Sequence, residues 1–243
     1  VVVDSAGNGH DQTLVGAPAT PLWSTDVPTL TGGNGYSLAF DGVNDYTYAW
    51  PIPALAGASQ VTMEAWVKFN SLGYHEALIS TGGWVFAESG DRLYIRFPNT
   101  NGCVTTGANL QTGQWYHVAF VFDSSQVAGE QLKAYRDGTP LPLDCGSSPP
   151  PTFPEGAISL GSVAGPAGII PLNGNLDEVR IYTVARSSTD IANDAAGAVG
   201  PTQPPPQHIP PPLTLPRDPV AYWKMEEGSG GVVVDSAGNG HDQ

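Results

Sequence analysis

The chain carries few charges, and basic residues are the scarcer kind. Nine Lys and Arg stand against 23 Asp and Glu in 243 residues, so the formal net charge is −14. A chain this acidic repels phosphate backbones and anionic lipid surfaces, which excludes nucleic acid and anionic membranes as expected partners. No run approaches the ~18 consecutive apolar residues that a membrane-spanning helix needs. The sequence therefore predicts no membrane insertion.

Helix-favouring Lys, Leu and Glu are also scarce, whereas 30 Gly and 23 Pro punctuate the chain. This composition favours short strands joined by turns. Apolar and polar residues alternate in the predicted strands Tyr36–Asp41, Asp45–Trp50, Val61–Phe69, Glu76–Thr81, Trp84–Glu88, Asp91–Phe97, Trp115–Asp123, Gln131–Arg136, Ala157–Ser162 and Leu176–Tyr182. The first two are predicted to form a hairpin around Gly42–Asn44. With one short helix, from Ser187 or Ser188 to about Ala196, the pattern predicts an all-β fold, an antiparallel β-sandwich (jelly roll).

Only two cysteines are present, Cys103 and Cys145, each in a polar, turn-rich segment. A disulfide between them would close a long loop and stabilise the fold by roughly 3–4 kcal/mol. Two free thiols are the alternative. Paired loop cysteines in an acidic, Lys-poor chain fit an oxidising compartment better, so we expect the disulfide and an extracellular or cell-surface location.

One stretch of the chain occurs twice. Val1–Gln12 reads VVVDSAGNGHDQ, and Val232–Gln243 is identical at every position. Such a match predicts that the chain is one period, plus an overlap, of a longer array of near-identical units. The alternative is a duplicated tag or cloning scar.

The proline-rich segment Gly200–Pro219 predicts an extended, stiff polyproline II linker. It divides the chain into a sandwich (1–199) that lacks its first strand, the linker (200–219), and a tail (220–243) that supplies the first strand and loop of the next repeat, or of the same domain in permuted order. In the strand Val220–Glu227, alternation places Ala221, Trp223 and Met225 on one face and Val220, Tyr222 and Lys224 on the other. The linker is long enough for either arrangement, and its stiffness favours the neighbouring unit.

Several motifs follow one another in a familiar order: VAYWKMEEGSGGVVVDSAGNGHDQTLVG, LAFDGVNDYTYAW, VTMEAWVKF, WYHVAFVFD, KAYRDGTPL, ISLGS and NGNLDEVRIYTVARSSTDI. Together they resemble the LamG-like jelly roll of the concanavalin A-like lectin/glucanase superfamily, in its bacterial tandem-repeat form. The resemblance covers the sandwich and excludes the proline-rich linker. The chain departs from it at the start, because the first strand lies at the C-terminal end. This architecture carries lectins, adhesins, accessory domains and glycoside hydrolases, so the fold alone does not assign a function.

A calcium site is predicted in the duplicated loop. Asp4, Asn8 and the carbonyls of this Gly-rich segment are oxygen ligands of the kind Ca²⁺ accepts. In the resembled family such a loop approaches the DEVRIY strand, which implies Asp177 as a further ligand. The alternative is that Asp4 and Asn8 only satisfy turn amides. Asp235 and Asn239 are the equivalents in the second copy.

We predict no catalytic residues. A concanavalin-like glycosidase needs two carboxylates on one strand face. Glu64 is isolated in its strand, and Asp177 and Glu178 are neighbours whose side chains point to opposite faces of a regular strand. His117, in the middle of an apolar strand, is expected to be structural.

The leading hypothesis is a structural repeat unit of an extracellular fibre or adhesin. Units would assemble with identical units by donating the strand 220–227 to a neighbour, with Val220, Tyr222, Trp223 and Met225 as the donated residues. The alternative is a calcium-dependent carbohydrate-binding module in a cell-surface array, with surface glycans as partners. Its candidate sugar contacts are Trp23, Trp50, Trp66 and Trp84, which could instead be core residues.

Overall fold

The computed structural model describes residues 1–16, 21–31, 33–98, 102–162, 171–197, 219–226 and 228. One set of strands comprises β1 (Thr13–Val15), β4 (Tyr46–Ala49), β6 (Tyr74–Thr81), β7 (Trp84–Ser89), β8 (Arg92–Arg96), β9 (Cys103–Thr105), β13 (Leu143–Cys145) and β14 (Ile158–Leu160). The other comprises β2 (Leu22–Ser24), β3 (Ser37–Asp41), β5 (Gln60–Phe69), β10 (Trp115–Asp123), β11 (Leu132–Arg136), β12 (Thr139–Leu141), β15 (Asn173–Tyr182) and β16 (Ala221–Trp223). The 3-10 helix η1 (Pro53–Leu55) and the α-helix α1 (Ser188–Ala195) complete the described elements.

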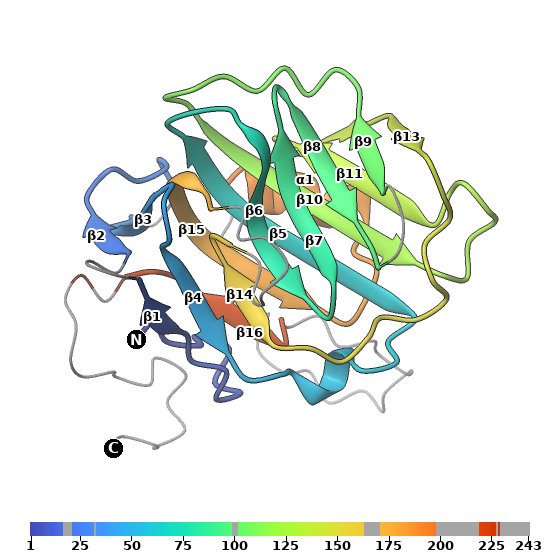
Figure 1. Ribbon diagram of the computed structural model, residues 1–243, viewed down its shortest axis with the longest axis horizontal. Coiled ribbons are helices and arrows are strands. Elements are labelled where there is room, and N and C mark those ends of the chain that lie inside the picture. The colour runs from blue at the N-terminus through green and yellow to red at the C-terminus, as the bar shows by residue number, and fades with distance from the viewer. Residues whose placement is uncertain are drawn as a thin grey trace, which may run out of the picture.

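The two sets form two antiparallel sheets packed face to face, which confirms the predicted sandwich (Figure 1). Sheet I has the order β1-β4-β14-β6-β7-β8-β9-β13. Sheet II has the order β12-β11-β10-β5-β15-β3-β2, and β16 is also paired with β15.

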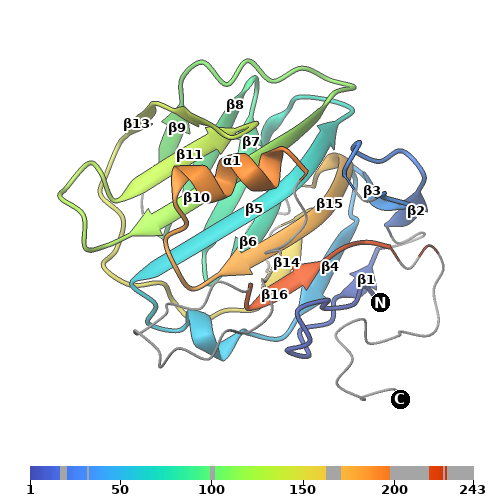
Figure 2. The ribbon, with the colours of Figure 1, turned by 180° about the vertical axis from the view of Figure 1, so that it is seen from behind.

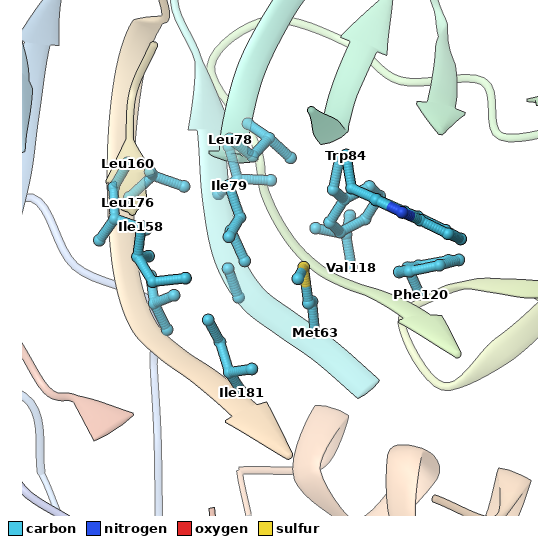
Figure 3. Close-up of a cluster of buried hydrophobic side chains, with 14 of the residues drawn as sticks. Met63, Leu78, Ile79, Trp84, Val118, Phe120, Ile158, Leu160, Leu176 and Ile181 are labelled. Atoms are coloured by element: carbon cyan, nitrogen blue, oxygen red, sulfur yellow. The ribbon is translucent and has the colours of Figure 1, made fainter. Parts of the chain in front are cut away.

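The core lies between the sheets and follows the period-two pattern of the sequence. Val61, Met63 and Phe69 of β5 are among the alternate residues buried there. Figure 3 shows Met63 of sheet II beside residues of sheet I such as Ile79. Trp84 contributes its indole to this core, 4.7 Å from the ring of Phe153. Each fully buried side chain of this size contributes about 1.5–3 kcal/mol.

Helix α1 covers the outer face of sheet II (Figure 2). Its capping box pairs Ser187 and Asp190, in agreement with the cap predicted from the sequence. Ile191 packs against Ala119 and Tyr135 of the sheet. The part of this face near β10 to β12 is therefore covered by protein, and the outer face of sheet I carries no helix among the described residues.

The predicted hairpin of Tyr36–Asp41 and Asp45–Trp50 is wrong, although both strands exist. β3 pairs with β2 and β15 in sheet II, whereas β4 pairs with β1 and β14 in sheet I. The turn between them crosses from one sheet to the other. Within it, the carboxylate of Asp41 accepts a hydrogen bond from the Val43 amide, and Asp45 accepts one from the Asp41 amide. The turn residues Gly42–Asn44 therefore connect the two sheets at an edge of the sandwich, and do not join two strands of one hairpin.

The displaced strand lies in the sheet of its own chain. β16 pairs antiparallel with the C-terminal half of β15, and β3 pairs with the N-terminal half. A β-bulge between Asp177 and Arg180, with Glu178 at a φ of 49°, separates the two halves. A bulge kinks a strand and raises its local twist, so one edge of β15 serves two partners from opposite ends of the chain.

Within this chain, β16 takes the position that the sequence allowed as the alternative, in the same domain in permuted order. Donation of 220–227 to a neighbouring unit stays a prediction. Ala221, Trp223 and Met225 are all fully buried in the core of the same chain, as the alternation predicted. Val220 continues the pairing, since its amide donates to the Ile181 carbonyl over 2.8 Å.

The predicted disulfide is confirmed. Cys103 in β9 and Cys145 in β13 are paired directly across the ladder, with their Cα atoms 4.0 Å apart. The cysteines belong to sheet I, while β10, β11 and β12 of the intervening chain belong to sheet II. The disulfide therefore closes a stretch of chain that contains three strands of the opposite sheet.

Most of the proline-rich linker (200–219) and the whole second copy of the duplicated segment (232–243) lie outside the described residues. In the described part, no helix is long and apolar enough to cross a membrane.

Candidate functional site

The outer face of sheet I presents ordered rows of side chains on neighbouring strands. Tyr74 of β6, Ser89 of β7 and Arg92 of β8 are paired across the ladders. Ala87 of β7 and Tyr94 of β8 form the next row. Small residues in the middle of a row leave room for large rings from the neighbouring row to lie over the sheet.

Three aromatic rings stack on this face. His75 lies between Tyr74 and Tyr94, with 3.9 Å between ring centroids on each side. The His75 and Tyr94 rings are 9° from parallel. Tyr94 is buried beneath, whereas Tyr74 is 78% exposed. We call Tyr74, His75 and Tyr94 the ring stack.

A backbone irregularity makes the ring stack. In a regular strand the side chains of Tyr74 and His75 would point to opposite faces. His75 instead has a φ of 64°, a left-handed conformation unusual for a residue other than glycine, and the register with β7 shifts between Tyr74 and Ala77. Strained backbone of this kind is concentrated at functional sites.

The surroundings keep His75 uncharged and place cations beside the stack. Burial, with a smaller effect of the nearby Arg96 charge, lowers the pKa of His75 below its usual value. Arg92 and Arg96 are both exposed at the ends of β8. Asp144 of β13 is exposed two strands away, in the row of Tyr94. Flat aromatic surface is thus flanked by side chains that donate and accept hydrogen bonds.

The four tryptophans predicted as sugar contacts have different environments. Trp84 is a core residue, and Trp23 is half-buried against the core. Trp66 is half-buried on the outer face of sheet II, edge-on to His117. Trp50 is 78% exposed and lies edge-on to Tyr48, with the ring centroids 6.0 Å apart. Trp50 alone of the four is freely accessible.

Glu64 and His117 belong to a closed polar cluster beneath α1. Both side chains are fully buried, with Glu64 Oε2 and His117 Nε2 3.8 Å apart. Burial raises the pKa of Glu64 to about 7 and lowers that of His117 to about 3, so the imidazole is neutral at pH 7 and the contact is not an ion pair. Tyr182 donates a hydrogen bond to Glu64, and the Arg180 guanidinium lies 3.7 Å from it. No sugar can reach these carboxylate oxygens without displacing protein.

Glu178, the other carboxylate considered for catalysis, ties β16 to β15. It accepts hydrogen bonds from Arg180, over 2.5 Å, and from the Tyr222 hydroxyl. The Arg180 guanidinium also lies over the Tyr222 ring, 4.4 Å from its centroid. These contacts assign Glu178 a structural role in holding the added strand in register.

Asp4 and Asn8, predicted as calcium ligands, make hydrogen bonds within the protein. The Asp4 carboxylate accepts from the amides of Ala6, His10 and Tyr222, over 3.0, 3.1 and 2.9 Å. Asn8 donates its side-chain amide to the Val220 carbonyl over 2.9 Å. The sequence allowed this as the alternative, in which Asp4 and Asn8 satisfy backbone groups of a turn. The structure adds backbone groups of the β16 segment to their partners.

The third predicted ligand, Asp177, lies beside different residues. Its carboxylate accepts from the Asn34 side-chain amide over 2.7 Å and from the Glu178 amide over 2.8 Å. In the ranges that the structure describes, no group of three or more His, Cys, Asp and Glu residues is arranged to hold a metal ion. Calcium binding stays a prediction.

The model of the family "Concanavalin A-like lectin/glucanases superfamily" matches residues 41–192. The chain belongs to this superfamily. The matched range includes the ring stack, the disulfide and the first part of the helix α1. No curated protein matches the chain.

Solved structures similar to this concanavalin A-like domain share its fold at low sequence identity. A provisionally assigned carbohydrate-binding protein from Bacteroides ovatus has a TM-score of 0.59 and 20% identity, over 87% of this chain and 62% of that one. A heptameric pentraxin from Limulus polyphemus has 0.56 and 15%, over 69% and 84%. Domain 4 of AbnA, an extracellular arabinanase from Geobacillus stearothermophilus solved with arabinotriose, has 0.55 and 20%, over 76% and 88%.

A pH dependence of stability follows from the buried carboxyls of this concanavalin A-like domain. Burial, reinforced by the Glu178 charge and opposed by the Asn34 hydrogen bond, raises the pKa of Asp177 to about 8. Burial likewise raises the pKa of Glu88 to about 7. The folded state therefore holds protons that the unfolded state has released, and stability falls as the pH rises from about 4 to 8. We expect a higher Tm at pH 5.5 than at pH 8.5.

Asp177→Asn should remove part of this slope, because an amide carries no charge at any pH. The stability gain of the variant over the unmodified protein should be larger at pH 8.5 than at pH 5.5, by on the order of 1–3 kcal/mol. Thermal melts at both pH values measure the difference. Asp144→Asn, at an exposed position, is the matched control and should leave the slope unchanged. Equal slopes for Asp177→Asn and the unmodified protein would contradict the raised pKa.

The ring stack was missed in the sequence because no pattern signals it. Tyr74 and His75 precede the predicted strand Glu76–Thr81 as an ordinary polar-aromatic pair. His75 of the concanavalin A-like domain combines a left-handed conformation with stacking on Tyr94, a residue 19 positions away in the sequence. Local propensity does not predict such a contact.

Proposed function

We propose that this domain is a non-catalytic carbohydrate-binding domain of an extracellular protein and that the ring stack is its sugar site. The observation that carries the proposal is Tyr74, 78% exposed and held against His75 on the face of the sandwich that α1 does not cover. An exposed ring held in place by stacking has little conformational freedom left to lose on binding.

The chemistry of the stack fits a sugar ring. The C–H face of a pyranose or furanose packs on an aromatic face, and its hydroxyls need partners at the rim. Arg92, Arg96 and Asp144 supply donors and acceptors there. His75 stays neutral, so it adds flat surface without a charge that would need to be desolvated.

Known structures support the same reading at the level of the fold. The arabinanase domain was solved with arabinotriose, and a carbohydrate-binding role has been provisionally assigned to the Bacteroides ovatus protein. The confirmed disulfide supports an extracellular location.

Tyr74→Ala should lower the affinity for the best oligosaccharide ligand at least about tenfold, equivalent to about 1.4 kcal/mol, through loss of the exposed stacking surface. The measurement is a glycan array with the whole chain, followed by titration calorimetry of the best ligand. Trp50→Ala, at an equally exposed aromatic outside the stack, is the matched control and should bind as the unmodified protein does. Unchanged affinity in Tyr74→Ala, or a loss confined to Trp50→Ala, would move the site away from the stack.

Calcium dependence is tested in the same titration. Calcium-dependent binding through Asp4, Asn8 and Asp177, the alternative that the sequence allowed, predicts weaker binding in EDTA, because hard oxygen ligands lose their ion to a chelator. Unchanged affinity in EDTA would separate the sugar site from any metal.

A second role, as a repeat unit in a surface array, is favoured by the identity of residues 1–12 and 232–243. Identical units on one polypeptide would present identical sugar sites. Sequencing of the natural transcript beyond this segment tests the array directly, and a single unit would contradict it.

A further inference from the structure

Residues 1–12 fill a specific site beside β16. The Ser5 amide donates to the Tyr222 carbonyl over 2.5 Å, and the Tyr222 amide donates to the Asp4 carboxylate over 2.9 Å. Asn8 then bonds the Val220 carbonyl over 2.9 Å. Both edges of the short added strand are therefore satisfied, one by β15 and the other by this segment.

The site accommodates the side chains of the segment as well as its backbone. Val2 and Gln12 are fully buried and joined by two backbone hydrogen bonds of 2.7 Å. Thr47 of β4 donates to the Gln12 side chain over 2.8 Å, and the Trp223 indole donates to the His10 carbonyl over 2.8 Å. A site that binds these side chains selects the sequence VVVDSAGNGHDQ rather than any extended peptide.

The segment runs antiparallel to β16. Ser5 lies against Tyr222 and Asn8 against Val220, so residue numbers rise along the segment as they fall along the strand. A chain that continued from β16 past Glu226 and turned back would run beside β16 along the path now taken by residues 1–12, and in the same direction. Residues 227–231, EGSGG, are turn-forming, and the second copy of the sequence begins immediately after them.

We propose that residues 232–243 are a second occupant of this site, and that the sandwich closes with either copy of VVVDSAGNGHDQ. The two closures make the same contacts, because the two copies have the same residues. They differ in connectivity. The first copy reaches the site through β1, and the second reaches it by a hairpin from β16. The proposal concerns how the fold is completed and is independent of the sugar-binding function.

Paired substitutions in the full chain test the proposal. Asp4→Ala removes the acceptor of three backbone amides, and Asp235→Ala removes its counterpart in the second copy. Because the intact copy can take the site, each single variant should melt within about 2 °C of the unmodified chain. The double variant should melt roughly 5 °C or more lower, since neither copy can then satisfy those amides. Asp91→Ala, at an exposed carboxylate, is the control.

Hydrogen exchange by mass spectrometry gives the second readout. In Asp4→Ala, amides of 232–243 should gain protection while those of 1–12 lose it. Two results would overturn the proposal: an Asp4→Ala variant that melts as low as the double variant, or a 232–243 segment that stays unprotected in Asp4→Ala. A double variant with an unchanged Tm would overturn it as well, because the site would then not depend on the bonds described.

Discussion

Trp223→Ala is expected to lower the free energy of unfolding by about 3–5 kcal/mol, which is the usual effect of truncating a large, fully buried aromatic residue. Trp223 is 0% exposed and belongs to the main core. Its loss also leaves the His10 carbonyl without the indole donor. For a domain of this size the change corresponds to a fall in Tm of roughly 10 °C. Calorimetry or circular dichroism measures it.

Trp50→Ala is the matched control, because Trp50 is 78% exposed and should contribute less than about 0.5 kcal/mol. The same melts should be repeated over a wide range of protein concentration. A Tm independent of concentration is expected when β16 completes its own sheet, whereas a strand shared between copies would make Tm rise with concentration. A stable Trp223→Ala variant would show that β16 is not part of the folded core.

Replacing both cysteines, Cys103→Ser with Cys145→Ser, should destabilise the domain by roughly 4 kcal/mol in the chain-entropy view of cross-links. The sequence separation of 42 residues sets this magnitude. The bond also joins the edge strand β13 to β9, so the edge is expected to fray first when the bond is absent. A fall in Tm of roughly 10 °C follows for a domain of this length.

Chemical reduction of the disulfide is the control for the double serine variant. Dithiothreitol should lower the Tm of the unmodified protein towards that of the double serine variant and leave the variant itself unchanged. A double variant that melts with the unmodified protein would mean that the loop closure contributes nothing to stability.

The alternation of apolar and polar residues, together with the composition, was sufficient to predict the sandwich and its central strands. Val61–Phe69 and Trp115–Asp123 appear as β5 and β10 because their apolar faces have no other way to be buried. Helix α1 was predicted from a serine cap, and its capping box confirms the reason. Two cysteines in a Lys-poor chain were enough to predict their bond. Each of these inferences depends on residues close in sequence or on a single possible pairing.

The pairing of strands that are distant in the sequence could not be predicted in the same way. The segment Gly42–Asn44 has the composition of a hairpin turn, yet the strands on either side join different sheets. Only the competing partners, β1 and β14 for one strand and β15 for the other, decide this. The destination of β16 was ambiguous for the same reason, because linker reach permits both closures.

The candidate sugar site was the least predictable part. Aromatic content pointed to four tryptophans, of which only Trp50 is freely accessible, while the ring stack consists of two tyrosines and a histidine. Its geometry depends on the positive φ of His75 and on the register shift beside it. Neither follows from residue identity, because a positive φ is uncommon at any residue other than glycine and the register shift is set by the pairing with β7.

The strand order of sheet I places the ring stack away from β1, the strand that follows the first copy of the duplicated segment. Tyr94 lies on β8, five strand spacings of about 4.8 Å from β1, or roughly 24 Å. If the ring stack binds sugar as proposed, several such modules on one polypeptide would bind a single polysaccharide at many points. Weak binding at each module would then add up to strong overall binding, because each bound module raises the effective concentration of the next one.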